Sequence, residues 1–260
     1  MLKEIWDYRQ MIISLVKKDL RGRYKGSVLG FLWTFVNPLF QILIYSFVFA
    51  YILPTGMEKY YLFLCVALIP WIFFQSAITG GSTSVLSQKD LVKKIYFPRE
   101  VLPISYVTSC FVNMLLCFIV VFAVVIVSRT RVSILGLCCL PVIMIVEYVL
   151  ALGIAMITSA LTVYFRDLEH ILGIVSMAWM YLTPVVYPSE RYEKLPSQLR
   201  FIMEHINPMS PIIGAYRTIL YSGKVPDMTN ILEALLLGAV FLVIGFVIFG
   251  KCKKHFAEEL

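Results

Sequence analysis

Residues 101–128, VLPISYVTSCFVNMLLCFIVVFAVVIVS, form a stretch of 28 residues without a charged side chain. A helix that crosses the hydrocarbon core of a membrane needs about 20 mostly apolar residues, each adding about 1.5 Å of length. This stretch therefore predicts one membrane-spanning helix. Its side chains do not alternate between polar and apolar, as those of a membrane β-strand would.

The rest of the chain repeats this pattern. Long stretches almost free of charge alternate with short segments that hold most of the 23 Lys and Arg and the 16 Asp and Glu, and 60% of all residues are hydrophobic. This composition excludes a soluble globular protein, a disordered chain and a disulfide scaffold. We expect an all-α integral membrane protein with six spans, at about residues 31–52, 60–79, 104–127, 134–161, 171–187 and 231–249.

Basic residues predict the orientation of these spans. With the N-terminus in the cytoplasm, 15 of the 23 Lys and Arg fall in cytoplasmic segments, and five of the other eight lie in one long outer loop. Cytoplasmic loops carry an excess of basic residues, and long loops count less in this rule. We therefore expect both termini inside the cell. The net charge of +7 then reflects topology and contact with anionic lipids, and we expect no nucleic-acid partner.

Two cytoplasmic segments outside the spans carry patterns of their own. Residues 1–28 contain an amphipathic helix that we expect in the membrane interface, either as an anchor or as a lever that touches a cytoplasmic partner. Gly80 and Gly81 are expected to break the second span. Residues 82–95 then form a short helix, which serves either as a solvated connector or as a docking element.

The long outer loop also contains apolar runs. Residues 195–206 are amphipathic, and residues 211–221 form a second run of about 11 residues, too short to span. Irregular backbone is tolerated inside a membrane only beside protein or a water-filled cavity. We therefore expect two short helices that dip into the outer leaflet.

No pattern for catalysis occurs in the sequence. It contains no G-x-x-x-x-G-K-[ST] phosphate loop, no H-E-x-x-H and no G-x-S-x-G, so we expect no enzyme, no bound metal and no cofactor in this chain. Glu147, a charge inside a span, serves either as an interhelical contact or in proton movement. A membrane-embedded sugar or acyl transferase stays open as an alternative. Its polar cluster would be Arg166, Asp167, Glu169 and His170.

Several motifs resemble the ABC-2 type permeases of the polysaccharide-export branch. They occur in the family's order, at residues 21–33 (RGRYKGSVLGFLW) with Pro38, 93–103 (KKIYFPREVLP), 164–170 (YFRDLEH), 183–187 (TPVVY) and 207–211 (NPMSP) with Tyr216 and Arg217. The resemblance runs nearly end to end. That family exports O-antigen, teichoic acid and related lipid-linked glycans, so the resemblance implies a permease in the cytoplasmic (inner) membrane of a bacterium.

The resemblance implies an architecture and partners. In this family two copies of the permease pair side by side, and two separate ABC ATPase subunits, which bind ATP and Mg²⁺, dock from the cytoplasm. Residues 1–28 would be the interface helix and residues 29–260 the transmembrane domain. Residues 82–95 would be the coupling helix on the ATPase, and the two outer helices would be re-entrant gate helices.

The resemblance also implies roles for individual residues. Contacts with the ATPase would involve Ser87, Gln88, Lys89, Asp90, Leu91 and Lys94. The substrate would be a glycan on undecaprenyl diphosphate, whose phosphates Arg21, Arg23 and Lys25 would attract, although these residues also suit the ordinary positive-inside rule. The first and fifth spans would line the glycan channel, with aromatic rings of Trp33, Phe40, Tyr45, Trp179 and Tyr181. The outer gate would include Asn207, Pro208, Pro211, Tyr216 and Arg217.

Two alternatives to these roles stay open. Most aromatic side chains of a membrane protein serve lipid contact and packing, and this applies to the predicted channel rings. An ABC-2 exporter of drugs or small lipids would share the six spans. The R-x-R-Y-K-G-S stretch and the F-P-R-E stretch argue against that alternative.

Overall fold

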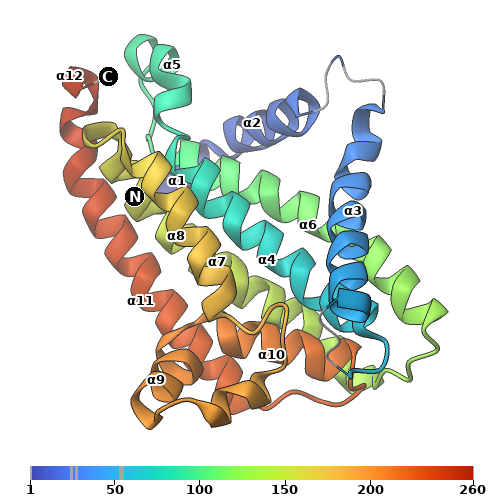
Figure 1. Ribbon diagram of the computed structural model, residues 1–260. Coiled ribbons are helices and arrows are strands. Elements are labelled where there is room, and N and C mark those ends of the chain that lie inside the picture. The colour runs from blue at the N-terminus through green and yellow to red at the C-terminus, as the bar shows by residue number, and fades with distance from the viewer. Residues whose placement is uncertain (1, 24–25, 27–28, 53–55, 260) are drawn as a thin grey trace.

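The computed structural model of the chain describes residues 2–23, 26, 29–52 and 56–259. In this part of the chain every regular element is helical, and no strand occurs. Long helices run between two ends of the molecule, and short helices cover each end (Figure 1). The upper end holds both termini, with α1 (Leu2–Asp7), α2 (Arg9–Gly22), α5 (Lys89–Lys94) and α12 (Phe256–Glu259). The lower end holds α9 (Ser197–Phe201) and α10 (Met209–Leu220).

Among the described residues, five helices are long and apolar enough to cross a membrane. The first joins the 3-10 turn η1 (Gly30–Leu32) to α3 (Trp33–Phe47), and the π-helical turn η2 (Val48–Ile52) follows it. The others are α4 (Tyr60–Ser82), α6 (Val101–Val127), α7 (Ile134–Tyr164) and α11 (Met228–Cys252), which continues into η6 (Lys253–His255). These helices coincide with five of the six predicted spans.

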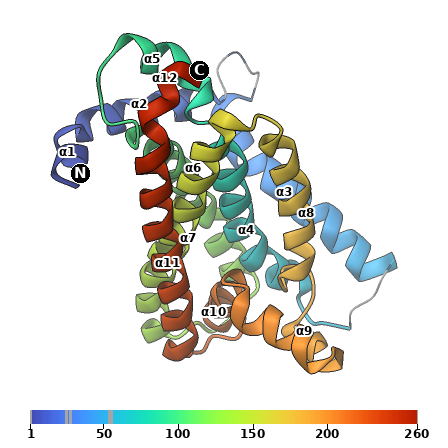
Figure 2. The same ribbon diagram turned by 90° about the vertical axis from the view of Figure 1, so that its left-hand side faces the viewer.

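The predicted span at residues 171–187 is shorter than expected. Its helix, α8 (Leu168–Leu182), has 15 residues, which corresponds to about 22 Å. The predicted end at residue 187 is wrong, because the helix stops at Leu182. Thr183 has an extended ψ of 141°, as expected for the residue before a proline, and Pro184 lacks the N–H that would continue the helix. Even so, α8 runs from the upper to the lower end beside α4 (Figures 1 and 2).

The expected helix break at Gly80 and Gly81 is wrong. α4 continues through both glycines to Ser82. A Cβ atom at Gly80 would overlap the side chain of Tyr106, and one at Gly81 would lie 2.9 Å from the Cβ of Ala155. The two glycines therefore allow close contact of α4 with α6 and α7, which is a common use of small residues between membrane helices.

The single helix expected over residues 82–95 is instead two shorter pieces. These are the 3-10 turn η3 (Leu86–Gln88) and the six-residue α5. The hydroxyl of Ser87 donates a hydrogen bond to the carbonyl of Ser84 at 3.2 Å. Such local bonds compete with regular helix, which explains why the segment is divided.

The other predicted short helices are present with different bounds. The N-terminal helix is divided at Tyr8 into α1 and α2, and α2 packs on α6. The outer run expected at residues 195–206 starts only after Pro196. It consists of α9 and the π-helical turn η5 (Ile202–Ile206), and the 3-10 helix η4 (Ser189–Lys194) precedes it. The run expected at residues 211–221 is α10, which contacts α4, α7 and α11.

The core is built around α4, whose side chains are mostly buried because α3, α6, α7, α8 and α10 surround it. Helices that are apolar all round are expected in such a central place. α3 and α8 both contact α4 and expose much of their other surface. The most extensive helix pair is α7 with α11, where Gly153, Gly238 and Gly245 bring the two backbones together.

Candidate functional site

At the upper end, the six residues predicted to contact a partner lie in one short segment. Ser87, Lys89, Asp90 and Lys94 are exposed, whereas Gln88 and Leu91 are half-buried. We call η3 and α5 together (residues 86–94) the docking turn. Lys18 of α2 donates a hydrogen bond to Gln88 at 3.3 Å, so the docking turn adjoins the N-terminal helix. It therefore offers a small charged surface that is connected to α4 on one side and to α6 on the other.

The residues that follow the docking turn hold the end of α11. Glu100, only 1% exposed, accepts a hydrogen bond from Lys253 Nζ at 2.6 Å. Arg99 donates to the carbonyl of Lys253, and its guanidinium carbon lies 5.9 Å from the ring centre of Phe256. We call Arg99, Glu100 and Lys253 the C-terminal clasp. No sequence pattern reveals this clasp, because Lys253 lies about 150 positions from Arg99 and Glu100.

Replacing Lys253 by Met should lower the free energy of unfolding by about 3 kcal/mol, because the buried Glu100 carboxylate would lose its charged partner. Thermal unfolding of the purified chain, followed by tryptophan fluorescence, measures this. Lys254→Met is the control, since Lys254 is exposed and forms no ion pair with the residues that the structure describes. It should change stability by less than about 0.5 kcal/mol. Equal effects of the two variants would show that the clasp contributes nothing.

The predicted phosphate-binding residues differ in their surroundings. Arg23 forms an ion pair with Asp19 at 3.1 Å and donates to Ser109 at 3.2 Å and Cys110 at 3.1 Å. The hydroxyl of Ser109 in turn donates to Asp19. This network attaches α2 to α6, so much of the hydrogen-bonding capacity of Arg23 is already used.

Arg21, a second predicted phosphate ligand, is not part of this network. Arg21 lies in the last turn of α2 and is exposed. Lys25 lies outside the described residues. Arg21 is thus the described basic residue of this set that a ligand reaches directly.

The predicted channel aromatics lie on α3 and α8, two helices that pack on α4 and expose much of their other surface. Phe40 and Tyr181 are exposed, at 58% and 54%, whereas Trp33 and Tyr45 are half-buried. Trp179 is different, because its indole N–H donates to Asn207 Oδ1 at 2.9 Å and its ring packs edge-on to Phe74 at 5.1 Å. Its contacts fix the end of α8.

At the lower end, Asn207 joins the end of α8 to the start of α10. Its amide nitrogen donates to Thr183 Oγ1 at 3.0 Å and to the carbonyl of Leu182 at 3.3 Å. Its amide oxygen accepts from Trp179 and from the backbone N–H of Met209 at 3.2 Å. Pro208 is buried and Pro211 half-buried, and both lie beside this junction at the start of α10.

Arg217 holds the turn that follows α8. It is 8% exposed and donates to the carbonyls of Pro184, Val185 (2.6 Å) and Tyr187 (3.3 Å). Its guanidinium carbon lies 3.5 Å from the ring centre of Phe63, a close cation–π contact. The motifs at residues 183–187 and 216–217 therefore meet in space, which their separation in sequence did not reveal.

The neighbouring residue Tyr216 attaches α10 to the core. Its hydroxyl donates to Glu147 Oε2 at 2.7 Å, and both side chains are fully buried. This contact joins α10 to α7 and supports the interhelical alternative for Glu147. Asn207, Tyr216 and Arg217, all predicted gate residues, thus connect α10 to its surroundings.

Replacing Arg217 by Met should lower the free energy of unfolding by about 3 kcal/mol, because buried carbonyls lose their donor. Arg200→Met is the matched control. Arg200 is exposed and pairs with Glu204 on the same helical surface, and such a pair contributes at most about 1 kcal/mol. Thermal unfolding of both variants checks this. A shift for Arg217→Met no larger than that for Arg200→Met would contradict the role of Arg217.

One stretch comes within a residue of a phosphate loop but has another use. Residues 245–252 are GFVIFGKC, which differs from G-x-x-x-x-G-K-[ST] only at Cys252. They lie inside α11, where the backbone N–H groups serve the helix, and a Cβ at Gly245 would lie 2.6 Å from the carbonyl of Gly153. A phosphate loop must point its N–H groups at the nucleotide. This stretch is therefore a helix contact.

The chain is similar in sequence to known proteins. The family described as ABC-2 type transporter matches residues 10–221. An O-antigen export system permease protein RfbA of Myxococcus xanthus is 31% identical over 270 residues, which cover 100% of this chain and 99% of that protein. Two proteins of the same name from Klebsiella pneumoniae are 33% and 31% identical over 250 residues, covering 96% of this chain and 95% of each.

Proposed function

The chain belongs to the ABC-2 type transporter family, and from this premise we propose that it is the permease subunit of an ATP-driven exporter of a lipid-linked polysaccharide. The observation that carries the proposal is the full-length similarity to O-antigen export permeases, at 31–33% identity. As a member of that family the chain is a membrane-embedded transport subunit, and ATP hydrolysis belongs to a partner. The glycan, its undecaprenyl diphosphate carrier and pairing of two copies are parts of the proposal.

We further propose six membrane crossings with the upper end in the cytoplasm. α8 makes the fifth crossing, and its 15 residues are supplemented by the turn that Arg217 holds. Both termini and the docking turn then share the cytoplasmic side, in agreement with the excess of basic residues there. α9 and α10 lie on the outer side, where α10 is re-entrant between the spanning helices.

The proposed mechanism uses the connections of the docking turn. Two ABC ATPase subunits, each with ATP and Mg²⁺, bind the docking turns of two permease copies. When the ATPases close, the force passes to α4 and α6, between which the docking turn lies, and to α11 through the C-terminal clasp. The channel opens between α3 and α8 of the paired copies. Phe40 and Tyr181, exposed on these helices, offer ring faces on which sugars stack.

At the cytoplasmic edge, Arg21 attracts the diphosphate of the lipid-linked glycan, because a guanidinium group binds phosphate oxygens with two parallel hydrogen bonds. Arg23 positions α2 through its network with Asp19 and Ser109 and contributes charge from there. At the outer side, α10 moves together with the end of α8, because Asn207 and Arg217 join them.

Deletion of the chain in its host tests the proposal. Surface glycan should disappear, and full-length glycan on its lipid carrier should accumulate inside the cell. Complementation with the wild-type chain should restore both. Surface glycan that persists at the parental level in the deletion strain would refute the proposed function.

The same experiment separates the exporter from a membrane-embedded transferase. A transferase defect would leave the glycan incomplete, whereas an export defect leaves it complete and trapped. The polar residues that a transferase would need, Arg166, Asp167, Glu169 and His170, are all exposed. Glu169 and His170 border a hollow of about 620 Å³, but Arg166 and Asp167 do not line it. Asp167→Asn with His170→Gln should therefore leave the length of the glycan unchanged.

A further inference from the structure

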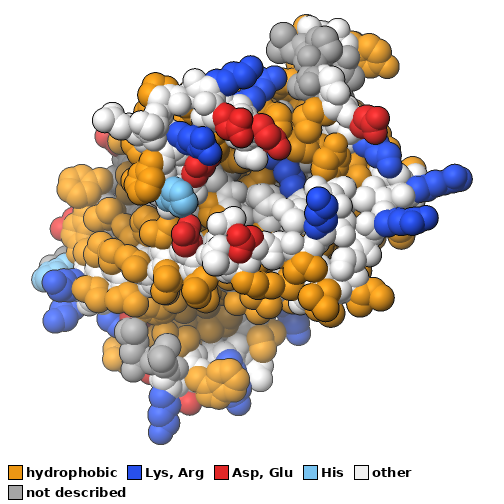
Figure 3. Space-filling view, turned by 90° about the horizontal axis from the view of Figure 1, so that it is seen from below, with side chains coloured by type: hydrophobic (Ala, Val, Ile, Leu, Met, Phe, Trp, Pro, Cys, Tyr) orange, Lys and Arg blue, Asp and Glu red, His pale blue; other side chains and the backbone are white. Residues whose placement is uncertain are grey.

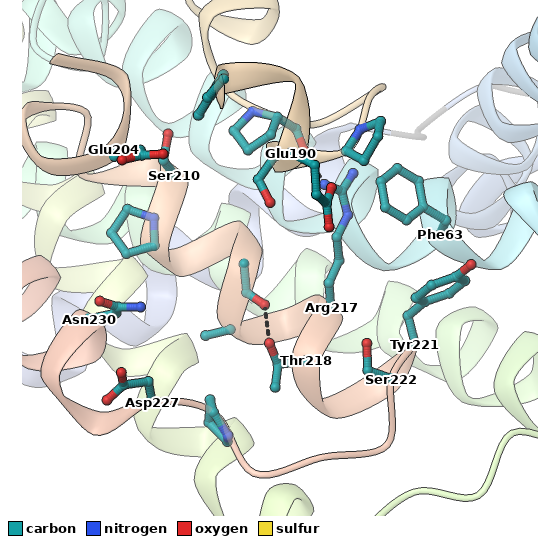
Figure 4. Close-up of a pocket in the computed structure, with 18 of the residues that line it drawn as sticks. Phe63, Glu190, Glu204, Ser210, Arg217, Thr218, Tyr221, Ser222, Asp227 and Asn230 are labelled. Atoms are coloured by element: carbon teal, nitrogen blue, oxygen red, sulfur yellow. Dashed lines mark hydrogen bonds between the residues drawn. The ribbon is translucent and has the colours of Figure 1, made fainter. Parts of the chain in front are cut away.

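A cavity of about 610 Å³ lies at the lower end, between α10, η4 and the start of α11. Figure 4 shows Arg217, Phe63 and Tyr221 on one side of it, and Glu204, Asp227 and Asn230 on the other. Seen from below, acidic side chains and a His lie near the middle of this face, with Lys or Arg side chains beside them (Figure 3). All lining residues of the cavity belong to one copy of the chain, and none of them lies on α3 or α8.

The cavity wall carries many groups that form hydrogen bonds with hydroxyl-rich molecules. The carboxylates of Glu190, Glu204 and Asp227 accept hydrogen bonds, and the amide of Asn230 both donates and accepts. The side chains of Glu190 and Asn230 form no hydrogen bond or ion pair with residues that the structure describes. Asp227 accepts hydrogen bonds from the backbone N–H and the hydroxyl of Thr229, and these bonds lower the pKa of Asp227.

The size and the charge of the cavity restrict the ligand further. Binding sites for small molecules commonly have volumes of about 300 to 1,000 Å³, and this one is within that range. Glu204 pairs with Arg200, so Glu190 and Asp227 are the lining carboxylates that form no ion pair with described residues, and the two terminal nitrogens of Arg217 already donate to backbone carbonyls. The wall thus disfavours an acidic ligand and suits a neutral or amino sugar, with the ring of Tyr221 as a stacking surface.

We propose that this cavity is an outer binding subsite, in each copy of the chain, for a short neutral or amino-sugar segment of the emerging glycan. The inference rests on the proposed function, because it assigns a place to the same substrate. Binding there retains the exported segment on the outer side and opposes its backward movement. The subsite borders Arg217, which binds the turn after α8. Occupation of the subsite is thereby coupled to the junction of α8 and α10 at the outer side.

Gly214 offers a way to fill the cavity without disturbing the fold. It lines the cavity from α10, and a Cβ atom there would meet no other atom within 4 Å. Gly250, at the other end of the molecule in α11, is equally open and serves as the matched control. Gly214→Phe should block the subsite, whereas Gly250→Phe should leave it intact.

The test measures binding of oligosaccharides to the purified exporter complex. The probe is the set of two- to six-sugar fragments released by mild acid from the surface glycan of the parent strain, and the readout is saturation-transfer NMR. The wild-type complex should bind the fragments, Gly214→Phe should weaken binding at least about tenfold, and Gly250→Phe less than about twofold. Glu190→Ala should weaken binding without filling the cavity, because a hydrogen-bond acceptor is lost.

The outcomes distinguish this inference from the proposed function. If deletion of the chain abolishes surface glycan but wild-type and Gly214→Phe complexes bind the fragments equally, only the subsite is refuted. The same holds if the wild-type complex binds no fragment. If the deletion strain still displays its glycan, the proposed function itself fails.

Discussion

Gly153→Leu is expected to abolish accumulation of the folded chain. Gly153 lies where α7 crosses α11, and a Cβ atom there would lie 2.5 Å from the backbone nitrogen of Leu242 and 2.6 Å from the carbonyl carbon of Phe241. Both neighbours are backbone atoms, so no side chain moves aside, and the two helices must separate. Overpacking of this kind costs about 3 kcal/mol or more, against a total stability of about 5–15 kcal/mol for a typical protein.

This contact matters because of its place in the fold. α7 and α11 form the most extensive helix pair, and α11 also carries the C-terminal clasp. Without a hydrophobic driving force between helices in lipid, close approach of small residues supplies much of the association. A larger residue at 153 thus weakens the packing that holds α11 in place.

Fluorescence-detected size-exclusion chromatography of the tagged chain measures the effect. The monodisperse yield of Gly153→Leu should fall to less than about a tenth of that of the wild type. Gly250→Leu is the control, since it introduces the same side chain on the same helix pair in open space. A yield of Gly153→Leu equal to that of Gly250→Leu would show that the crossing tolerates separation.

The second large effect concerns the docking turn. The double charge reversal Asp90→Arg with Lys94→Glu should abolish export while the chain stays folded. Both side chains are exposed and form no ion pair with residues that the structure describes. Their reversal therefore costs the folded chain little. It would place like charges against the complementary surface of the proposed ATPase partner, which costs several kcal/mol of docking energy.

Capture of the ATPase through a tag on the permease measures this directly. The reversed variant should retain less than about a tenth of the wild-type ATPase and export no glycan. Glu193→Lys, an exposed charge reversal at the opposite end, should leave capture unchanged. Wild-type capture by the reversed variant would place the coupling contact elsewhere on the chain.

The long helices were predictable from the sequence because the absence of charge over about 20 residues has one physical meaning in a membrane protein. The predicted helix bounds were wrong where a local sequence rule and the rest of the sequence pattern disagreed. Gly80 and Gly81 suggest a helix break, but here they allow α6 and α7 to approach α4. Conversely, the apolar run at residues 171–187 continues past Leu182, although Pro184 ends its helix.

The candidate site was predictable only as separate motifs. The sequence marked residues 183–187 and Arg217, but not that the guanidinium binds the carbonyls of that turn. Nor did it pair Glu100 with Lys253 or Glu147 with Tyr216. The last two contacts join positions that are 153 and 69 residues apart, and the periodicity of a sequence does not predict contacts over such separations.

Reconstitution in liposomes tests whether the chain and its ATPase move the glycan across a membrane. The purified permease and its ATPase are placed in liposomes that contain the lipid-linked glycan in their outer leaflet, with the ATPase on the outside. We expect ATP to make the glycan progressively resistant to an added glycosidase. This protection should require both proteins and be lost with the double charge reversal of the docking turn. Glycan that stays fully accessible while the ATPase hydrolyses ATP on the bound permease would contradict the proposed export.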